Sequence, residues 1–214
     1  EYVKRTIGQA MPELLPRMSV VRNGVDTDYF QPGAPPTEPS GSTLRVLVMA
    51  RLTKWKRVEL AIEAAAATHV HLTIAGEGEE RSALEGLASR LGARVPFLGR
   101  LADPRPALAA CDVLMSTAQA EPLGLTALEA QASARPVIVG GSGGIGEVVL
   151  HERTGWVVKD ETAPGFAEAL RHAIQRRTER PSMGKAARAH GGDAGRSQAM
   201  CRAYGDRYRS LVKA

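Results

Sequence analysis

The chain has 214 residues, of which 43% are hydrophobic, 24% charged and 4% aromatic. These proportions exclude a disordered or fibrous protein and predict a soluble globular fold. The net charge of +5 favours anionic partners such as nucleotides or phosphates. We find no signal-peptide pattern and no apolar run of about 18 residues, so we expect no membrane-spanning segment.

The first part of the chain predicts the end of one domain and a linker. The pattern of residues 1–16 predicts one helix with no strand before it, as if the chain continued a larger architecture. Asn23-Gly24 indicates a turn, and the Pro-, Gly- and Ser-rich segment Gln31 to Thr43 indicates an exposed connector. We therefore expect residues 1–43 to be the end of an N-terminal domain and an interdomain linker.

From Leu44 onward, apolar stretches of strand length alternate with helical patterns. The expected strands are 44–50, 70–75, 94–98, 112–116, 136–139 and 156–158. The expected helices are 56–68, 79–91, 104–111, 124–134 and 146–151. Repeated strand and helix predict an α/β fold, a doubly wound, Rossmann-like parallel sheet with helices on both faces, over residues 44–190.

The end of the chain predicts helices without a further strand. Residues 164–214 carry helical patterns that Gly191-Gly192 are expected to interrupt. We therefore expect residues 191–214 to be a C-terminal helical segment that returns over the domain or crosses to a partner domain.

Ligands of doubly wound sheets bind at the carboxyl ends of the strands, which selects the loops that follow each strand. One of them runs from Glu121 to Glu129 and opens a helix. Leu123, Gly124 and Leu125 would present backbone N–H groups there, which favour phosphate or another electron-rich oxygen. Glu129, one turn into the helix, could reach the same ligand and accept two hydrogen bonds from a ribose diol. The alternative is that neither carboxylate binds a ligand, and that Glu121 caps the helix while Glu129 lies on its surface.

This segment, Glu121-Pro-Leu-Gly-Leu-Thr-Ala-Leu-Glu129-Ala130, resembles the paired-glutamate motif E-x7-E of the family-four retaining glycosyltransferases. Those enzymes have the GT-B fold, in which two Rossmann-like domains face each other. The resemblance implies that Glu121 contacts the donor sugar and that Glu129 contacts the ribose. It also implies that the amides of residues 123–125 serve the sugar and the diphosphate.

The loop Met49-Ala-Arg-Leu-Thr-Lys-Trp-Lys-Arg57 resembles the G-R-L-x-x-x-K-G loop of the same family. The resemblance implies that Arg51 and Lys56 bind the diphosphate. Lys54 and Arg57 could stand in for them, because the loop is basic throughout. An arginine fork and a lysine point charge would stabilise the negative charge that grows on a leaving diphosphate. Glu121, Arg51 and Lys56 are thus the candidate catalytic residues. Without the paired glutamates, a solvated basic loop would be the favoured interpretation.

Three further segments resemble the family. Arg22 to Phe30 resembles an interdomain signature, Phe97 to Leu101 a loop that contacts the base, and Gly143 to Glu147 a G-G-x-x-E loop. The second of these adds Leu101 to the donor-binding candidates. The chain departs from the family pattern at Ala50, at Ala134-Arg135 and at Gly146, none of which is a proposed contact.

The resemblance implies the donor-binding domain of a glycosyltransferase of the hexosyltransferase type that takes a nucleoside-diphosphate sugar. It implies no metal and no cofactor, and an acceptor held by an N-terminal domain of the same protein. We expect the isolated chain to turn over slowly or not at all. We also expect a cytoplasmic location, including peripheral contact at the inner face of a membrane, and no nucleic acid partner, because no aromatics interleave the basic residues.

Two other functions remain open from the sequence. Gly141 to Gly146 satisfies G-x-G-x-x-G, with Asp160 about twenty residues on, as in NAD sites. That fingerprint belongs in the first βα unit, whereas here it follows the fifth expected strand. Sugar-nucleotide epimerases share the two-domain architecture, so the fold alone does not decide between them and a transferase.

Overall fold

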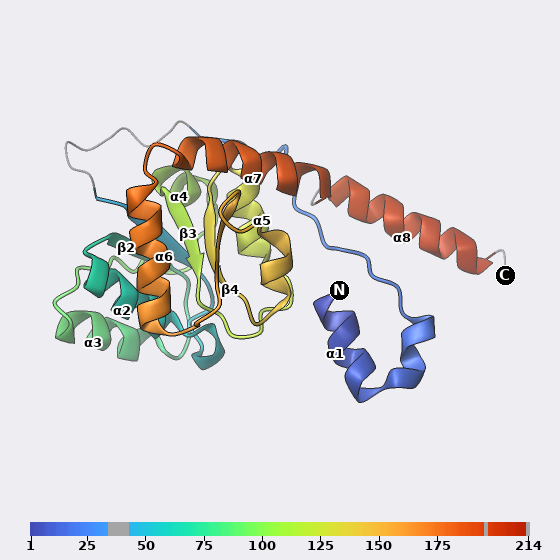
Figure 1. Ribbon diagram of the computed structural model, residues 1–214, viewed down its shortest axis with the longest axis horizontal. Coiled ribbons are helices and arrows are strands. Elements are labelled where there is room, and N and C mark those ends of the chain that lie inside the picture. Colours follow the sequence, from blue (N-terminus) through green and yellow to red (C-terminus); the bar gives the residue numbers. More distant parts are fainter. Residues whose placement is uncertain (34–42, 195–196, 213–214) are drawn as a thin grey trace.

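The computed structural model describes residues 1–33, 43–194 and 197–212 (Figure 1). Its centre is a parallel sheet of five strands in the order β2-β1-β3-β4-β5. The strands are β1 Arg45–Met49, β2 His71–Ala75, β3 Val113–Ser116, β4 Val137–Gly140 and β5 Gly155–Val158. In register, Val46 lies opposite both Leu72 and Val113. The predicted doubly wound α/β fold is confirmed.

Helices cover both faces of the sheet because alternate strand residues point to opposite sides. Val46 and Val48 enter one core with α2 (Val58–Thr68), α3 (Arg81–Arg90) and α6 (Ala163–Gln175). Leu47 and Leu114 enter the other, with α4 (Arg105–Ala110), α5 (Leu125–Ala132) and the 3-10 helix η3 (Gly144–Val148). Because the five strands are parallel, their carboxyl ends all lie at one edge of the sheet.

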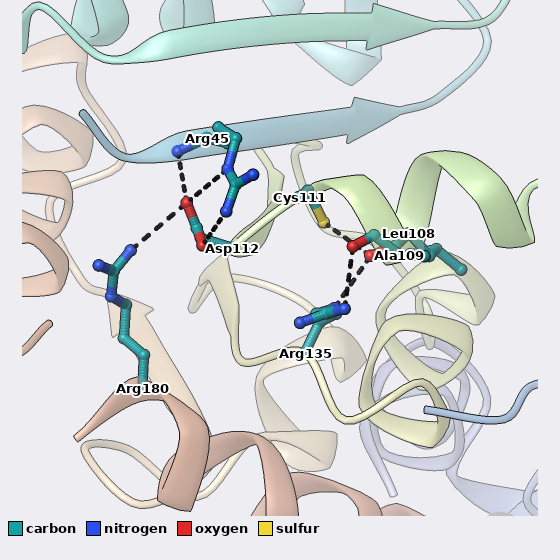
Figure 2. Close-up of polar contacts among 7 residues, drawn as sticks. All are labelled: Arg45, Leu108, Ala109, Cys111, Asp112, Arg135 and Arg180. Carbon is teal, nitrogen blue, oxygen red and sulfur yellow. Dashed lines mark hydrogen bonds and ion pairs between the residues drawn. The ribbon is translucent and has the colours of Figure 1, made fainter. Parts of the chain in front are cut away.

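Ion pairs hold the opposite, amino-terminal edge of the sheet (Figure 2). Asp112, just before β3, accepts hydrogen bonds from the Arg45 backbone N–H at 2.9 Å and from its guanidinium at 3.0 and 3.1 Å. The Arg180 guanidinium, at the start of α7 (Arg180–Ala194), lies 3.6 Å from the same carboxylate. Burial alone would raise the pKa of Asp112, but these hydrogen bonds and charges lower it. Arg135 donates to Leu108 O and Ala109 O at the end of α4.

Helix α7 also fixes the segment that precedes the sheet. The Arg188 guanidinium donates to Phe30 O at 2.8 Å, to Thr27 O at 3.2 Å and to Ala132 O at the end of α5. Its second terminal nitrogen also donates to Gln31 Oε1 at 3.1 Å. One side chain thus ties the 27–31 turn to the helix that carries Glu129.

The prediction of one helix over residues 1–16 is wrong. The structure has α1 (Tyr2–Ala10) and then a 3-10 helix, η1 (Pro12–Arg17). Met11 between them has φ −140° and ψ 74°. A residue before proline avoids the α region, so Pro12 ends the first helix.

Two predicted elements near the sheet are also wrong. Residues 94–98 form no ladder strand and contribute one bridge, between Phe97 and Ile74. Pro96 has no N–H to donate, which shortens the pairing there. In place of an α-helix over 146–151, the chain forms the shorter η3.

The tail is more continuous than its glycines indicate. Helix α7 runs through Gly191-Gly192, so the predicted interruption is wrong and the expected boundary at residue 191 falls inside a helix. Gly191 is buried against the Gln131 side chain, and this packing outweighs the low helix propensity of glycine. Helix α8 (Ser197–Val212) then extends away from the sheet (Figure 1).

The last two expectations concern the predicted connector and membrane-spanning segments. Most of the predicted connector, residues 34–42, lies outside the described residues. Among the helices that the structure describes, none combines the length and the apolar character that crossing a bilayer requires.

Candidate active site

A cavity of about 580 Å³ opens at the carboxyl ends of β1 and β2. It is lined by Met49, Ala50, Arg51, Ala75, Gly76, Glu77, Arg100, Leu101, Pro104, Thr126 and Glu129. Three predicted donor-binding residues, Arg51, Leu101 and Glu129, therefore meet in one cavity although they come from three separate segments. This is the edge where ligands of doubly wound sheets bind.

The cavity wall that Glu129 supplies has unusual electrostatics. Glu129 lies one turn into α5, and its burial raises the pKa of the carboxyl to about 7. Burial has this effect because a low-dielectric surrounding disfavours the charged form. A polar group held in a half-buried position at the edge of an open cavity is suited to a ligand that supplies hydrogen bonds, such as a diol.

Lys56 and Glu121 do not line this cavity and instead pair with each other. The Lys56 ammonium lies 2.5 Å from Glu121 Oε2, and the two side chains are only 18% and 14% exposed. Two hydrogen bonds join their loops. Thr117 Oγ1 donates to Lys56 O at 3.0 Å, and Gln119 N–H donates to Trp55 O at 3.0 Å. The structure thus unites two further predicted residues across the β1 and β3 loops.

The start of α5 presents the predicted amides. Gly124, the residue before the helix, has φ +79°, and a Cβ there would lie 2.5 Å from the Ile145 side chain. Only glycine adopts this backbone readily so close to a neighbour. Within the described ranges, no residue accepts a hydrogen bond from the N–H groups of Leu123, Gly124 or Leu125. These donors remain for a ligand at the positive end of the helix dipole.

The glycine-rich loop 141–146 has a supporting role. A Cβ on Gly143 would lie 2.4 Å from Glu121 O, and one on Gly144 would lie 1.9 Å from Pro122 O. Ile145 N–H donates to Glu121 O at 3.0 Å. The glycines therefore let this loop pack directly against the Glu121 backbone.

Arg57 is not available as a stand-in for Lys56. Its guanidinium pairs with the Glu161 carboxylate and donates to Thr117 O at 3.1 Å. Glu161 also accepts from Ser142 N–H at 2.6 Å. The sequence reasoning missed Glu161, because no motif spacing connects it with the basic loop. Lys54, by contrast, is exposed.

A Rossmann-like sheet with this paired-glutamate helix and basic loop defines one half of a GT-B glycosyltransferase. The chain belongs to the family "Glycosyl transferases group 1", whose sequence profile matches residues 35–190. The predicted family is thereby confirmed.

Known proteins extend this similarity. The chain is 38% identical over 132 residues to the lipopolysaccharide core biosynthesis glycosyltransferase LpsE of Rhizobium meliloti, covering 60% of the chain and 39% of the relative. It is 34% identical over 197 residues to the GDP-mannose-dependent monoacylated alpha-(1-6)-phosphatidylinositol monomannoside mannosyltransferase of Corynebacterium glutamicum, covering 82% of the chain and 51% of the relative. The chain thus spans about half the length, or less, of these relatives.

A solved structure shows the same fold. HepE of Anabaena, crystallised in complex with UDP, superposes with a TM-score of 0.82 at 24% identity, over 92% of this chain and 58% of HepE. At this level of identity the likeness concerns the fold.

Proposed function

We propose that this chain is the donor-binding domain of a retaining hexosyltransferase that takes a nucleoside-diphosphate sugar. The base lies beside Leu101, the ribose on Glu129 and the diphosphate between Arg51 and Lys56. The sugar lies by Glu121, and the amides of Leu123 to Leu125 serve the sugar and diphosphate. The supporting observation is that Arg51, Leu101 and Glu129 line one cavity at the ligand-binding edge of the sheet.

The proposed reaction breaks the bond between the anomeric carbon and the diphosphate oxygen and forms a bond from that carbon to the acceptor oxygen on the same face. The acceptor proton passes to the departing phosphate. Negative charge grows on that phosphate, where the Arg51 fork, the Lys56 ammonium and the start of α5 would stabilise it. These cationic groups take the part that a metal ion plays in other transferases, so we propose a reaction without metal or cofactor.

The acceptor site belongs, in this proposal, to an N-terminal domain of the same protein. Apolar side chains are exposed on and directly after α1, where Val3, Ile7 and Met11 are 36–50% exposed, and on α8, where Tyr208 is 66% exposed. These two helices lie on the same side of the sheet (Figure 1). We propose that this side carries the acceptor domain.

The names of two relatives suggest where the acceptor is found. One relative is a lipopolysaccharide core glycosyltransferase, and the other acts on a phosphatidylinositol mannoside. By analogy, and because the chain carries a net charge of +5, we propose a cytoplasmic enzyme that works at the inner face of a membrane.

Calorimetric titration of the chain with UDP, GDP, their sugar conjugates and NAD tests the donor site. We expect saturable binding of one nucleoside diphosphate, and Glu129→Ala to weaken it about tenfold or more, because two hydrogen bonds to the ribose are lost. Repeating the titration at two salt concentrations separates this site from unspecific attraction to a basic surface.

Glu168→Ala is the matched control, since Glu168 is an exposed helical carboxylate on α6. Equal affinities for the Glu129 and Glu168 variants would contradict the ribose assignment. Binding of NAD in place of nucleoside diphosphates would contradict the proposed function.

A further inference from the structure

Trp55 stands beside the paired charges of the candidate site. It belongs to the 3-10 helix η2 (Lys54–Lys56), and 42% of it is exposed. Single exposed hydrophobic residues are common on protein surfaces, so exposure alone carries no functional meaning. The position of the indole relative to Lys56 is what distinguishes this residue.

The Lys56 ammonium contacts both an aromatic face and a carboxylate. Its Nζ is 4.0 Å from the centroid of the Trp55 ring and 2.5 Å from Glu121 Oε2. The ring face carries the negative part of the aromatic quadrupole, so it attracts the cation, and tryptophan does this best among the aromatic residues.

The backbone keeps the indole in this place. Trp55 O accepts a hydrogen bond from Gln119 N–H at 3.0 Å, and Lys56 O accepts one from Thr117 Oγ1 at 3.0 Å. Both partners belong to the loop that leads from β3 to Glu121. The tryptophan is thus anchored to the loop that leads to Glu121, whose carboxylate pairs with Lys56.

An aromatic face suits a lysine that must exchange partners. A lysine side chain has four flexible carbons, and its ammonium carries three donor hydrogens. Among the described residues, Glu121 alone accepts a hydrogen bond from the Lys56 ammonium. The indole attracts the cation without occupying a donor hydrogen, so the remaining hydrogens can serve an incoming phosphate.

We propose that Trp55 is a positioning residue that holds the Lys56 ammonium ready for the donor diphosphate through a cation–π contact. This inference rests on the proposed function, since it assumes that Lys56 receives the diphosphate. It adds that the binding energy of the diphosphate depends on the ring next to the lysine, whereas binding of the nucleoside does not.

A double-mutant cycle isolates the pair. The chains compared are the unsubstituted protein, Trp55→Leu, Lys56→Met and the double variant, each titrated with UDP, GDP, uridine and guanosine. We expect Trp55→Leu to weaken nucleoside diphosphate binding on the order of fivefold and to leave nucleoside binding unchanged. In the Lys56→Met background the same substitution should have no further effect.

Two further variants sharpen the cycle. Trp55→Phe keeps a weaker aromatic face, so it should lie between the parent and Trp55→Leu. Lys54→Met removes a neighbouring exposed charge and should not couple to Trp55. In the NMR spectrum of the free chain, the ring should shift the Lys56 ε-CH2 protons upfield, and Trp55→Leu should abolish that shift. Thermal unfolding of each variant verifies that it is folded.

The possible outcomes separate the inference from the function. An equal loss from Trp55→Leu with and without Lys56, or an equal loss of nucleoside binding, would overturn the positioning role while donor binding stands. Absence of the NMR shift would overturn it as well. If the unsubstituted chain binds no nucleoside diphosphate, the proposed function fails and the inference fails with it.

Discussion

Burial of the Glu129 carboxyl opposes its ionisation near neutral pH. Its carboxyl is partly withdrawn from water, which raises its pKa from an ordinary 4.5 to about 7, and it faces a cavity that we assign to a ribose. The folded state therefore binds more protons than the unfolded state between these two values. As a result, the free energy of unfolding falls as the pH rises from 4.5 to about 7.

Substitution of this carboxyl should remove that pH dependence. We expect Glu129→Gln to stabilise the chain more at pH 8, where the native carboxyl is charged, than at pH 5, where it is protonated in the fold. Denaturant unfolding at both pH values measures the difference, and Glu168→Gln on the exposed face of α6 serves as the control. The same gain in stability at pH 5 and pH 8 would show that burial does not control the charge of Glu129.

The predictability of single residues depended on whether a motif places them. The spacing E-x7-E and the basic loop resemble a family pattern, and this resemblance predicts roles for Glu121, Glu129, Arg51 and Lys56. The structure brings them to one edge of the sheet, while their roles stay predictions. The pairing of Arg57 with Glu161 was not predictable from the sequence. The two residues are more than 100 positions apart and meet only because two loops fold next to each other.

At the scale of elements, the loop 141–146 acts as a support for the paired-glutamate segment. Gly144 lies so close to Pro122 O that a Cβ would come within 1.9 Å of it, whereas one on Gly146 would find its nearest neighbour at 3.7 Å. A short sequence therefore contains one glycine required by a backbone contact and one that has space for a methyl group.

Alanine substitutions should separate these two glycines. We expect Gly144→Ala to displace the Glu121 segment, to lower the midpoint of thermal unfolding and to weaken sugar-nucleotide binding more than binding of the free nucleotide. Gly146→Ala should change neither the free energy of unfolding nor the free energy of sugar-nucleotide binding by more than about 0.5 kcal/mol. Thermal unfolding and calorimetry on both variants measure this, and similar effects of the two substitutions would exclude the supporting role.

Elements were predictable where local pattern and tertiary packing agree. The five ladder strands and the helices α2 to α6 follow apolar patterns that the two cores satisfy. The pattern failed at residues 94–98, where Pro96 limits pairing, and at Gly191-Gly192, where burial against Gln131 carries the helix through two poor helix formers. Burial of this kind depends on a partner element distant in sequence.

At the scale of the whole molecule, the donor and acceptor sites would lie on different domains. The relatives named above are about twice as long as the matched region or longer, because the chain covers 39% and 51% of them. The described residues supply a five-stranded sheet with a cavity at its ligand-binding edge, and they expose apolar side chains on α1 and α8. Binding of the donor and transfer of its sugar should therefore be separable.

We expect the 214-residue chain to bind a sugar nucleotide without transferring the sugar rapidly. Transfer requires that an acceptor hydroxyl be oriented at the anomeric carbon, and a freely diffusing alcohol lacks the effective concentration that a second domain provides. Release of nucleoside diphosphate is measured with glycerol or a simple glycoside as acceptor, in a preparation whose donor binding has been verified by calorimetry. Rapid turnover by this chain would show that the acceptor site lies within residues 1–214 and would contradict its assignment to another domain.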